Sequence, residues 1–162
     1  MKLEMTMMKT EKLDRVVLYV QDIEKSKALY ADLLGIEFDE IPFPDVDPVR
    51  MIPGDSDGTP AEEAANTGAP PWRVAISPVG LELIEGALEP GDEPQVACFH
   101  FKVEDYEAAK AEMAAKGIPL NVDITLGKLR EAMYSPQGEQ GPMMGLVSYP
   151  DQYVMDSIKT KG

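Results

Sequence analysis

One short segment holds the only cysteine and the only histidine of the chain. Cys98 and His100 stand two residues apart in QVACFHFKV, residues 95–103. Side chains of an extended strand alternate between its two faces, so Cys98, His100 and Lys102 are predicted to share one face. Three interpretations stay open for this face: the edge of a metal site, a catalytic pair, or two core residues that pack together.

The composition narrows the class of protein. A length of 162 residues suits one domain or two small modules with a shared core, and a hydrophobic content of 44% supports a packed interior. The net charge of −14 argues against nucleic acid as a partner, because phosphate binding needs clustered Lys and Arg. A single cysteine excludes an internal disulfide framework.

The sequence also predicts where the protein is found. The first residues, MKLEMTMMKTEK, lack the apolar core of a signal peptide. The chain has no run of about 18 apolar residues, so no membrane partner is expected. A lone cysteine fits a reducing compartment, and the predicted location is the cytoplasm.

An internal repeat organises the chain. Residues 15–36, RVVLYVQDIEKSKALYADLLGI, are similar to residues 98–118, CFHFKVEDYEAAKAEMAAKGI. The residues that recur 83 positions later in the second segment are Val20, Asp22, Glu24, Lys27, Ala28 and Ala31. One residue is then dropped, after which Gly35 matches Gly117. Because one offset spans a strand, a turn and a helix, the chain is predicted to contain two copies of one unit.

Each copy has the pattern of β-α-β-β-β. An alternating strand leads to an aspartate that can cap a helix, Asp22 or Asp105. The predicted buried stripes of the helices are Ile23, Tyr30, Leu33 and Leu34 in the first copy and Tyr106, Ala109 and Met113 in the second. The later strand-like segments are residues 36–41, 72–77 and 81–85 in the first copy and residues 118–124, 130–134 and 145–149 in the second.

These elements set the predicted boundaries. Residues 1–12 form an extension, residues 13–89 the first module, residues 95–150 the second module and residues 151–162 a tail. Within the first module, residues 42–71 hold seven of the fourteen prolines and show no apolar period. A connection of this length is typical of a lid over a cavity or of a flexible insert, and both alternatives stay open.

The doubled unit resembles a known superfamily. The segments LDRVVLYVQDIEKSKALYADLLGIEF, GLELIE and FKVEDYEAAKAEMAAKGI are similar to the vicinal oxygen chelate superfamily of glyoxalase I, methylmalonyl-CoA epimerase, extradiol dioxygenases and bleomycin-resistance proteins. The resemblance covers about residues 13–149. It implies an α+β fold in which two tandem βαβββ modules form curled mixed sheets around a cavity, with the helices outside. It does not identify the reaction, because one fold hosts unrelated functions.

The resemblance also implies where a metal would bind. In metal-dependent members a ligand, most often His, opens the first strand of each module, and a carboxylate usually lies on the last strand. The corresponding positions here are Arg15 and Cys98, then Glu82 and about Gly145. Arginine keeps its proton and glycine has no side chain, so the metal site of the family is largely lost. Cys98, His100 and Glu82 remain as an alternative zinc site, which the cation of Arg15 opposes. No metal and no cofactor are therefore predicted.

Arg15 is the most informative of these substitutions. A guanidinium inside a cavity needs an anionic partner. In one alternative Arg15 and Glu82 form a structural ion pair in place of the metal. In the other, Arg15 binds a carboxylate, phosphate or enolate oxygen of a ligand. His100, Glu82 and Arg15 are the catalytic candidates if the protein is an enzyme.

Further residues are predicted to line the cavity. Strand parity places Tyr19 and Lys102 on the face of Arg15 and Cys98. The full set of predicted ligand-binding residues is Arg15, Tyr19, Trp72, Cys98, Lys102, Arg130, Tyr134 and Met144. Trp72, Arg130 and Tyr134 are expected at its mouth, and Met144 beside Met143 is expected to supply an adaptable apolar wall.

Two classes of function are favoured. The first is a metal-independent binding protein that sequesters a small organic molecule, as in the resistance branch, and an acidic surface suits a cationic drug. The second is a metal-independent lyase, isomerase or cyclase in which His100 or Glu82 moves protons and Arg15 stabilises an oxyanion. A metalloenzyme of the glyoxalase or dioxygenase type is a third alternative. A homodimer is predicted, because open sheet edges are covered by pairing modules within or between chains.

Overall fold

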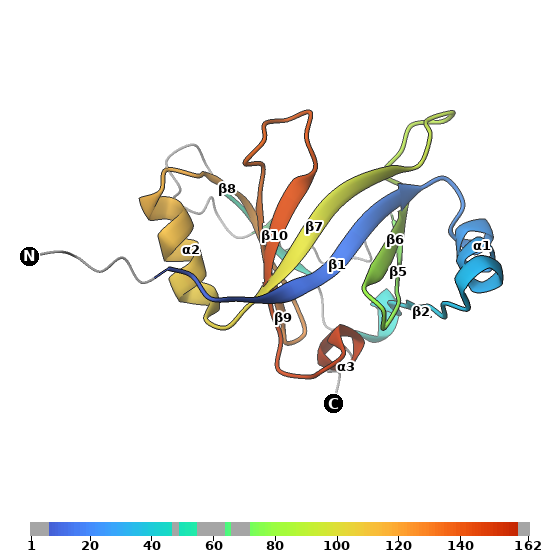
Figure 1. The fold of residues 1–162 in the computed structure, drawn as a ribbon, viewed down its shortest axis with the longest axis horizontal. Coiled ribbons are helices and arrows are strands. Elements are labelled where there is room, and N and C mark those ends of the chain that lie inside the picture. Colours follow the sequence, from blue (N-terminus) through green and yellow to red (C-terminus); the bar gives the residue numbers. More distant parts are fainter. Residues whose placement is uncertain (1–6, 47–48, 55–63, 66–71, 159–162) are drawn as a thin grey trace, which may run out of the picture.

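The computed structural model describes residues 7–46, 49–54, 64–65 and 72–158 of the chain. Within these ranges ten strands form one curled sheet in the order β2-β5-β6-β1-β7-β10-β9-β8-β3-β4 (Figure 1). The strands are β1 (Thr10–Val20), β2 (Asp39–Glu40), β3 (Arg50–Pro53), β4 (Ala64–Ala65), β5 (Arg73–Ile76), β6 (Leu81–Glu85), β7 (Gln95–Val103), β8 (Leu120–Leu126), β9 (Leu129–Tyr134) and β10 (Met143–Ser148). The helices are α1 (Ile23–Leu34), α2 (Tyr106–Ala115) and α3 (Val154–Ile158). None of the helices in the described ranges has the length and apolar character needed to span a membrane.

The two modules pair inside one chain through their first strands. β1 and β7 run antiparallel at the centre of the sheet. Each central strand then pairs in parallel with the last strand of its own module, β1 with β6 and β7 with β10. The remaining pairs are antiparallel, so the sheet is mixed and the predicted α+β fold of two βαβββ modules is confirmed.

The first two helices start at the aspartates that the repeat indicated. The carboxylate of Asp22 accepts a hydrogen bond from the backbone N–H of Lys25, and Asp105 does the same for Ala108, both at 3.0 Å. These contacts satisfy backbone donors that a helix leaves free in its first turn. Gly35 ends α1 at φ 66°, a backbone conformation that glycine adopts without strain.

The predicted buried stripe is correct for α2 and wrong for the last turn of α1. Tyr106, Ala109 and Met113 are buried, but in α1 only Ile23 is buried, and Leu33 and Leu34 are exposed. The reason is the small extent of the cluster beneath α1. The rings of Tyr30 and Phe38, 6.3 Å apart between centroids, lie at its margin, and the last turn extends beyond them.

The long connection of residues 42–71 contributes strands, which the sequence did not indicate. After a short 3₁₀ turn, Phe43–Asp45, it reaches the far side of the sheet, where β3 pairs antiparallel with β8 and β4 pairs with β3. The predicted strand over residues 36–41 is correspondingly short, with only β2 formed. Residues 47–48, 55–63 and 66–71 of the predicted lid or flexible insert lie outside the described residues.

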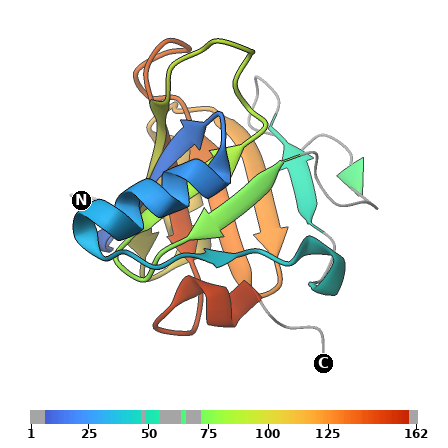
Figure 2. The same cartoon turned by 90° about the vertical axis from the view of Figure 1, so that its right-hand side faces the viewer.

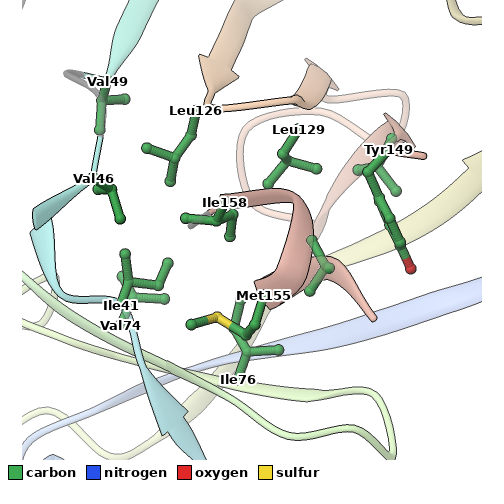
Figure 3. Packing of buried hydrophobic residues seen from close by; sticks show 12 residues of the cluster. Ile41, Val46, Val49, Val74, Ile76, Leu126, Leu129, Tyr149, Met155 and Ile158 are labelled. Carbon is green, nitrogen blue, oxygen red and sulfur yellow. The ribbon is translucent and has the colours of Figure 1, made fainter. Parts of the chain in front are cut away.

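The segment predicted as a tail carries α3, which fills part of the space inside the curled sheet. Met155 and Ile158 of α3 are fully buried. Figure 3 shows them between two sets of residues, Ile41, Val46, Val49, Val74 and Ile76 from the first module and Leu126, Leu129 and Tyr149 from the second. Together these form one apolar cluster, so α3 connects both modules and the long connection in a common core.

Candidate functional site

The strand faces follow the parity predicted for β1 and β7. Val17 and Cys98 are register partners and pack in one cluster with Met133, on the sheet face opposite α1 and α2. This inner side of the curl is called the concave face below. Val20 and Val103 instead pack beneath α1 and α2. Arg15 lies two residues before Val17, and His100 lies two residues after Cys98. Residues two apart in a strand point to the same side, so Arg15 and His100 also lie on the concave face.

The register supports the equivalence between the two modules. Glu82 on β6 pairs with Val17, and Gly145 on β10 pairs with His100, which lies 83 positions after Val17. Gly145 therefore occupies the position that Glu82 has in the first module. A Cβ atom at Gly145 would stand 2.7 Å from Cδ2 of His100. The imidazole of His100 thus fills the space that a side chain at Gly145 would need.

Arg15 lies at the centre of a buried charged cluster. Its Nη2 donates to Oε1 of Glu131 at 2.6 Å and to Nδ1 of His100 at 2.7 Å. Its Nη1 lies 3.5 Å from Oε2 of Glu82, and its Nε lies 3.3 Å from Oδ2 of Asp14. A guanidinium only donates, so Nδ1 of His100 accepts and the neutral imidazole carries its hydrogen on Nε2. One cation is therefore surrounded by three carboxylates and a neutral histidine.

A β-bulge brings Asp14 into this cluster. Leu13 pairs with Phe101 and Arg15 with His100, so Asp14 is the extra residue between them. A bulge of this kind re-aims side chains, and Asp14 and Arg15 are both buried although they are adjacent in the strand. The hydroxyl of Tyr149 donates to Oδ1 of Asp14 at 2.5 Å, which fixes the carboxylate.

Burial decides the protonation of the cluster. Burial raises the pKa of Glu82 to about 7. The charge of Arg15 lowers this pKa, while the negative charges of Glu131 and Asp14 raise it. Burial likewise lowers the pKa of His100 to about 4, with Arg15 acting in the same direction. Burial also opposes the ionised form of Glu131, but contact with His100 and Arg15 lowers its pKa below the usual value. At neutral pH the imidazole is neutral and Glu82 is partly protonated.

Four buried polar atoms have no hydrogen-bond partner within the described part of the chain. They are Nε and Nη1 of Arg15, Oδ2 of Asp14 and Oε2 of Glu82. The ion-pair distances of 3.3 and 3.5 Å place opposite charges close together without hydrogen-bond geometry. Such atoms in a native protein usually meet a water or a ligand atom.

The residues at the family's metal positions do not fit a metal ion. The guanidinium of Arg15 lies against Glu82, the one carboxylate among these positions. Burial raises the pKa of the Cys98 thiol, as do the nearby carboxylates, which disfavours the thiolate that a metal needs. No group of three or more His, Cys, Asp and Glu side chains within the described ranges has a geometry that could hold a metal. A cationic side chain thus occupies the place where a metal would otherwise counter Glu82.

Apolar side chains continue the concave face beyond Glu82. Five partly buried residues pack on the Val17–Cys98–Met133 cluster, and they are called the apolar wall: Tyr19, Ile84, Val122, Ile124 and Met143. Trp72 packs against the neighbouring cluster, to which Ile84 and Ile124 also belong. Glu82 and Ile84 are two residues apart on β6, so their side chains share one face. Glu82 therefore lies between Ile84 of the wall and Arg15.

The opposite side of the charged cluster is closed to larger molecules. A pocket of about 40 Å³ there is lined by residues that include Lys12, Asp14, Arg15, Tyr149 and Tyr153. This volume has room for water, whereas ligand pockets hold about 300–1,000 Å³. An organic ligand therefore does not fit on this side of the cluster.

Several predicted ligand-binding residues lie where the sequence placed them. Tyr19 and Cys98 are in or against the wall, and Trp72 lies beside it. Lys102 is on the correct face, but its Nζ stands 3.8 Å from the centre of the Tyr149 ring, at the closed side of the cluster. Arg15, Glu82 and His100, the three catalytic candidates, come together as predicted.

Arg130, Tyr134 and Met144 lie on the opposite face, which corrects the prediction that they line the cavity. Arg130 pairs with Glu107 of α2 at 2.6 Å, and Tyr134 and Met144 pack in the cluster beneath α2. The error is one residue in parity, because Glu131, Met133 and Met143 are the neighbours that face inward. A one-residue shift in a strand moves every side chain to the other face.

Sequence reasoning did not identify Asp14, Glu131 and Tyr149. The sequence contains a signal for Glu131. Leu129 and Met133, two residues before and after it, are apolar and buried, so Glu131 points to the same face, whereas Arg130 points to the other. Asp14 had none, because a bulge breaks the alternation that a sequence pattern depends on. Tyr149 follows the last strand, and only the tertiary fold brings it to Asp14.

Comparisons with known proteins agree with this architecture. The family model described as Glyoxalase/Bleomycin resistance protein/Dioxygenase superfamily matches residues 12–139. No curated protein sequence is significantly similar to this chain.

Solved structures share the fold at low sequence identity. Methylmalonyl-CoA epimerase of Mycobacterium tuberculosis is 16% identical, with a TM-score of 0.61 over 93% of this chain and 95% of that one. A hypothetical protein of Bacillus halodurans C-125 is 15% identical, with a TM-score of 0.60 over 86% and 95%. Methylmalonyl-CoA epimerase of Streptomyces coelicolor, solved with 2-nitronate-propionyl-CoA, is 18% identical, with a TM-score of 0.55 over 87% and 96%.

Proposed function

Because this chain belongs to the glyoxalase/bleomycin resistance protein/dioxygenase superfamily, we propose that it binds a small organic molecule on the concave face without a metal ion. The ligand class is an apolar molecule with a basic nitrogen. The observation that supports this proposal is the position of the Arg15 guanidinium, which stands against Glu82 where the family would place a metal.

The charge of the cluster argues for a cationic ligand. Three carboxylates, from Asp14, Glu82 and Glu131, already surround Arg15, so a carboxylate or phosphate of a ligand would be repelled by them. Three carboxylates around one guanidinium leave an excess of negative charge as Glu82 ionises. Oε2 of Glu82 is buried without a hydrogen-bond partner among the described residues, 3.5 Å from Nη1 of Arg15, and its residue lies two positions before Ile84 of the apolar wall. A protonated amine at this oxygen would supply the missing donor and the missing charge.

The wall provides the rest of the contact. Tyr19, Ile84 and Met143 offer an apolar surface that is neither fully buried nor fully exposed. The ring of Tyr19 lies on the same face as Glu82, and Trp72 stands beside the wall. Aromatic faces stabilise cations as well as apolar groups. The net charge of −14 would also raise the local concentration of a cation.

A matched set of probes tests the proposal. Trp72 is the only tryptophan, so its fluorescence reports on molecules that contact the wall. A phenylalkylamine, the phenylalkanol and the phenylalkanoate of equal chain length differ only in the polar end. The amine should bind most tightly. Its affinity should rise about tenfold between pH 6 and pH 8, because Glu82, with a pKa of about 7, ionises over this range.

Two variants complete the test. Glu82→Gln should remove both the preference for the amine and its pH dependence. Glu93→Gln, which neutralises an exposed carboxylate in the turn before β7, should change neither. Equal binding of all three probes, or tightest binding of the carboxylate, would count against the proposal.

A second function is supported by the pKa of Glu82. A carboxyl group that titrates near 7 can take a proton from carbon and return it at neutral pH, as a metal-independent isomerase or lyase requires. His100, with a pKa of about 4, is a weak base under the same conditions. Methylmalonyl-CoA, the compound named for the similar epimerases, is a direct probe. Loss of its C2 proton signal in deuterium oxide, abolished in Glu82→Gln, would support the enzyme over the binding protein.

A further inference from the structure

A small pocket lies on the Asp14 side of the charged cluster. Its volume is about 40 Å³, and Asp14 and Arg15 are among the residues that line it. Figure 2 shows α3 below the sheet, and the pocket lies between the start of α3, β1 and the turn after β5. Lys12 and Gln152, which are both exposed, also line it. The pocket therefore connects part of the buried cluster with the surface.

The four buried polar atoms without a hydrogen-bond partner among the described residues form two pairs. Nε of Arg15 lies 3.3 Å from Oδ2 of Asp14, and Nη1 of Arg15 lies 3.5 Å from Oε2 of Glu82. Each pair consists of one donor and one acceptor. Asp14 and Arg15 line the pocket, but Glu82 is not one of its lining residues. An occupant of the pocket can therefore satisfy the first pair and not the second.

The other polar groups at this pocket already have partners. The hydroxyl of Tyr149 donates to Oδ1 of Asp14 at 2.5 Å, so this oxygen is occupied. The hydroxyl of Tyr153, another lining residue, has two acceptors of its own at 2.7 and 3.0 Å. Oδ2 of Asp14 and Nε of Arg15 thus remain as one acceptor and one donor for a molecule in the pocket.

The charges and the volume define the class of molecule that fits. A cation would lie beside the guanidinium of Arg15, and an anion would lie beside the carboxylate of Asp14, so each would be repelled by one of the two groups. A neutral molecule that both donates and accepts a hydrogen bond suits both. About 10–15 Å³ is enough for one water molecule, whereas organic ligands need about 300 Å³ or more.

We propose that this pocket is a binding site for water, in which one molecule accepts a hydrogen bond from Nε of Arg15 and donates one to Oδ2 of Asp14. Leaving both atoms buried without a partner would cost free energy, and a bridging water offsets that cost. Nη2 of Arg15 is already bound by Glu131 and His100. The water therefore holds a second edge of the guanidinium and positions Nη1 beside Glu82. This site does not depend on the ligand proposed above.

Nuclear magnetic resonance tests the site in the protein alone. The Nε–H proton of Arg15 should show a nuclear Overhauser effect from water, with the sign of a molecule that tumbles with the protein. The Nε–H proton of Arg73 is the matched control, because it donates to Glu40 at 2.6 Å and should show no such signal. A hydroxyl proton that exchanges with water could relay the effect. Tyr149→Phe removes the hydroxyl bound to Asp14, and the signal at Arg15 should persist in this variant.

A crystal soaked in rubidium bromide identifies the molecule directly. Electron density for a water should lie at hydrogen-bond distance, about 2.7–3.2 Å, from both Nε of Arg15 and Oδ2 of Asp14. Neither rubidium nor bromide should give an anomalous signal in the pocket. An ion at this position, or no density between the two atoms, would overturn the proposal. So would the absence of the water signal at Arg15, or its loss in Tyr149→Phe.

Discussion

At the scale of single residues, the dominant feature is one buried guanidinium among three carboxylates. Burying a single charge costs desolvation free energy, and in such a cluster the attraction between opposite charges offsets that cost. Arg15 is 2% exposed and contacts Asp14, Glu82, Glu131 and His100. Its first role is therefore to neutralise these side chains, which makes the stability of the fold depend on it.

Replacement of Arg15 should destabilise the protein strongly. Arg15→Leu leaves buried carboxylates without a counter-charge, and the expected loss is about 3–5 kcal/mol in the free energy of unfolding. Arg15→Lys should lose less, because the charge remains while the fork that reaches Glu131 and His100 is lost. Urea denaturation measures both values. A change below about 1 kcal/mol in Arg15→Leu would show that the cluster contributes little to folding.

Glu82 and His100 should give opposite dependences of stability on pH. The folded pKa of Glu82 is about 7, above the usual glutamate value of 4.5, so its stabilisation is complete below pH 4.5 and is lost as the pH rises through 7. The folded pKa of His100 is about 4, below the usual histidine value of 6.5, so its stabilisation is present above pH 6.5 and is lost as the pH falls through 4. The two effects partly cancel between pH 4.5 and pH 6.5.

Single variants should separate the two effects. In His100→Asn, the free energy of unfolding should fall as the pH rises from 4.5 to 7. In Glu82→Gln, it should rise with pH from 4 to 6.5. Urea denaturation at half-unit pH steps measures both trends. Parallel pH profiles in the two variants would contradict these assignments.

At the scale of elements, close packing between two strands holds the imidazole in place. Gly145 on β10 pairs with His100 on β7, and the backbone of Gly145 lies directly beneath the ring. Arg15 fixes the other side of the ring through Nδ1. The ring is therefore confined between a strand and a hydrogen bond, and it has little freedom to move.

Gly145→Ala should disturb this arrangement. The new methyl group would stand 2.7 Å from Cδ2 of His100 and 3.1 Å from Sδ of Met133. Overpacking of this kind costs about 1–3 kcal/mol in the free energy of unfolding. His100→Ala in the same chain removes the clash, so the double variant should lose less than the sum of the two single variants. Additive losses would indicate that the ring and Gly145 do not compete for space.

At the scale of the whole molecule, the two modules share one sheet and one core. β1 and β7 pair along most of their length, and α3 packs against both modules in the cluster that also contains Ile41 and Leu129. Neither module retains a complete core when the other is removed. The modules are therefore expected to fold as one unit, although the sequence repeat marks two.

Unfolding should consequently be a single transition. Trp72 lies at the junction between the first module and the shared cluster, while far-ultraviolet circular dichroism reports on all elements. In urea the two signals should give the same midpoint, as a two-state domain requires. Midpoints that differ by more than the experimental error would show that the modules unfold separately, and would exclude a shared core as the main source of stability.

The sequence by itself determined the local features of this protein. The offset of 83 identified the two modules, and the caps Asp22 and Asp105 located the starts of their helices. Alternation within β1 and β7, combined with the offset of 83 and the metal positions that the family resemblance implies, placed Arg15 and His100 on one face. These features depend on residues that are close in the chain, and a sequence pattern records them directly.

Only the tertiary structure decided which side chains complete the site. Glu131 meets Arg15 across 116 positions, and Tyr149 meets Asp14 across 135. The bulge at Asp14, the parity of β9 and β10 and the course of β3 across the sheet arise from register between distant strands. Register is set by the packing of the whole chain, because a shift of one residue changes every inward side chain without changing the local pattern.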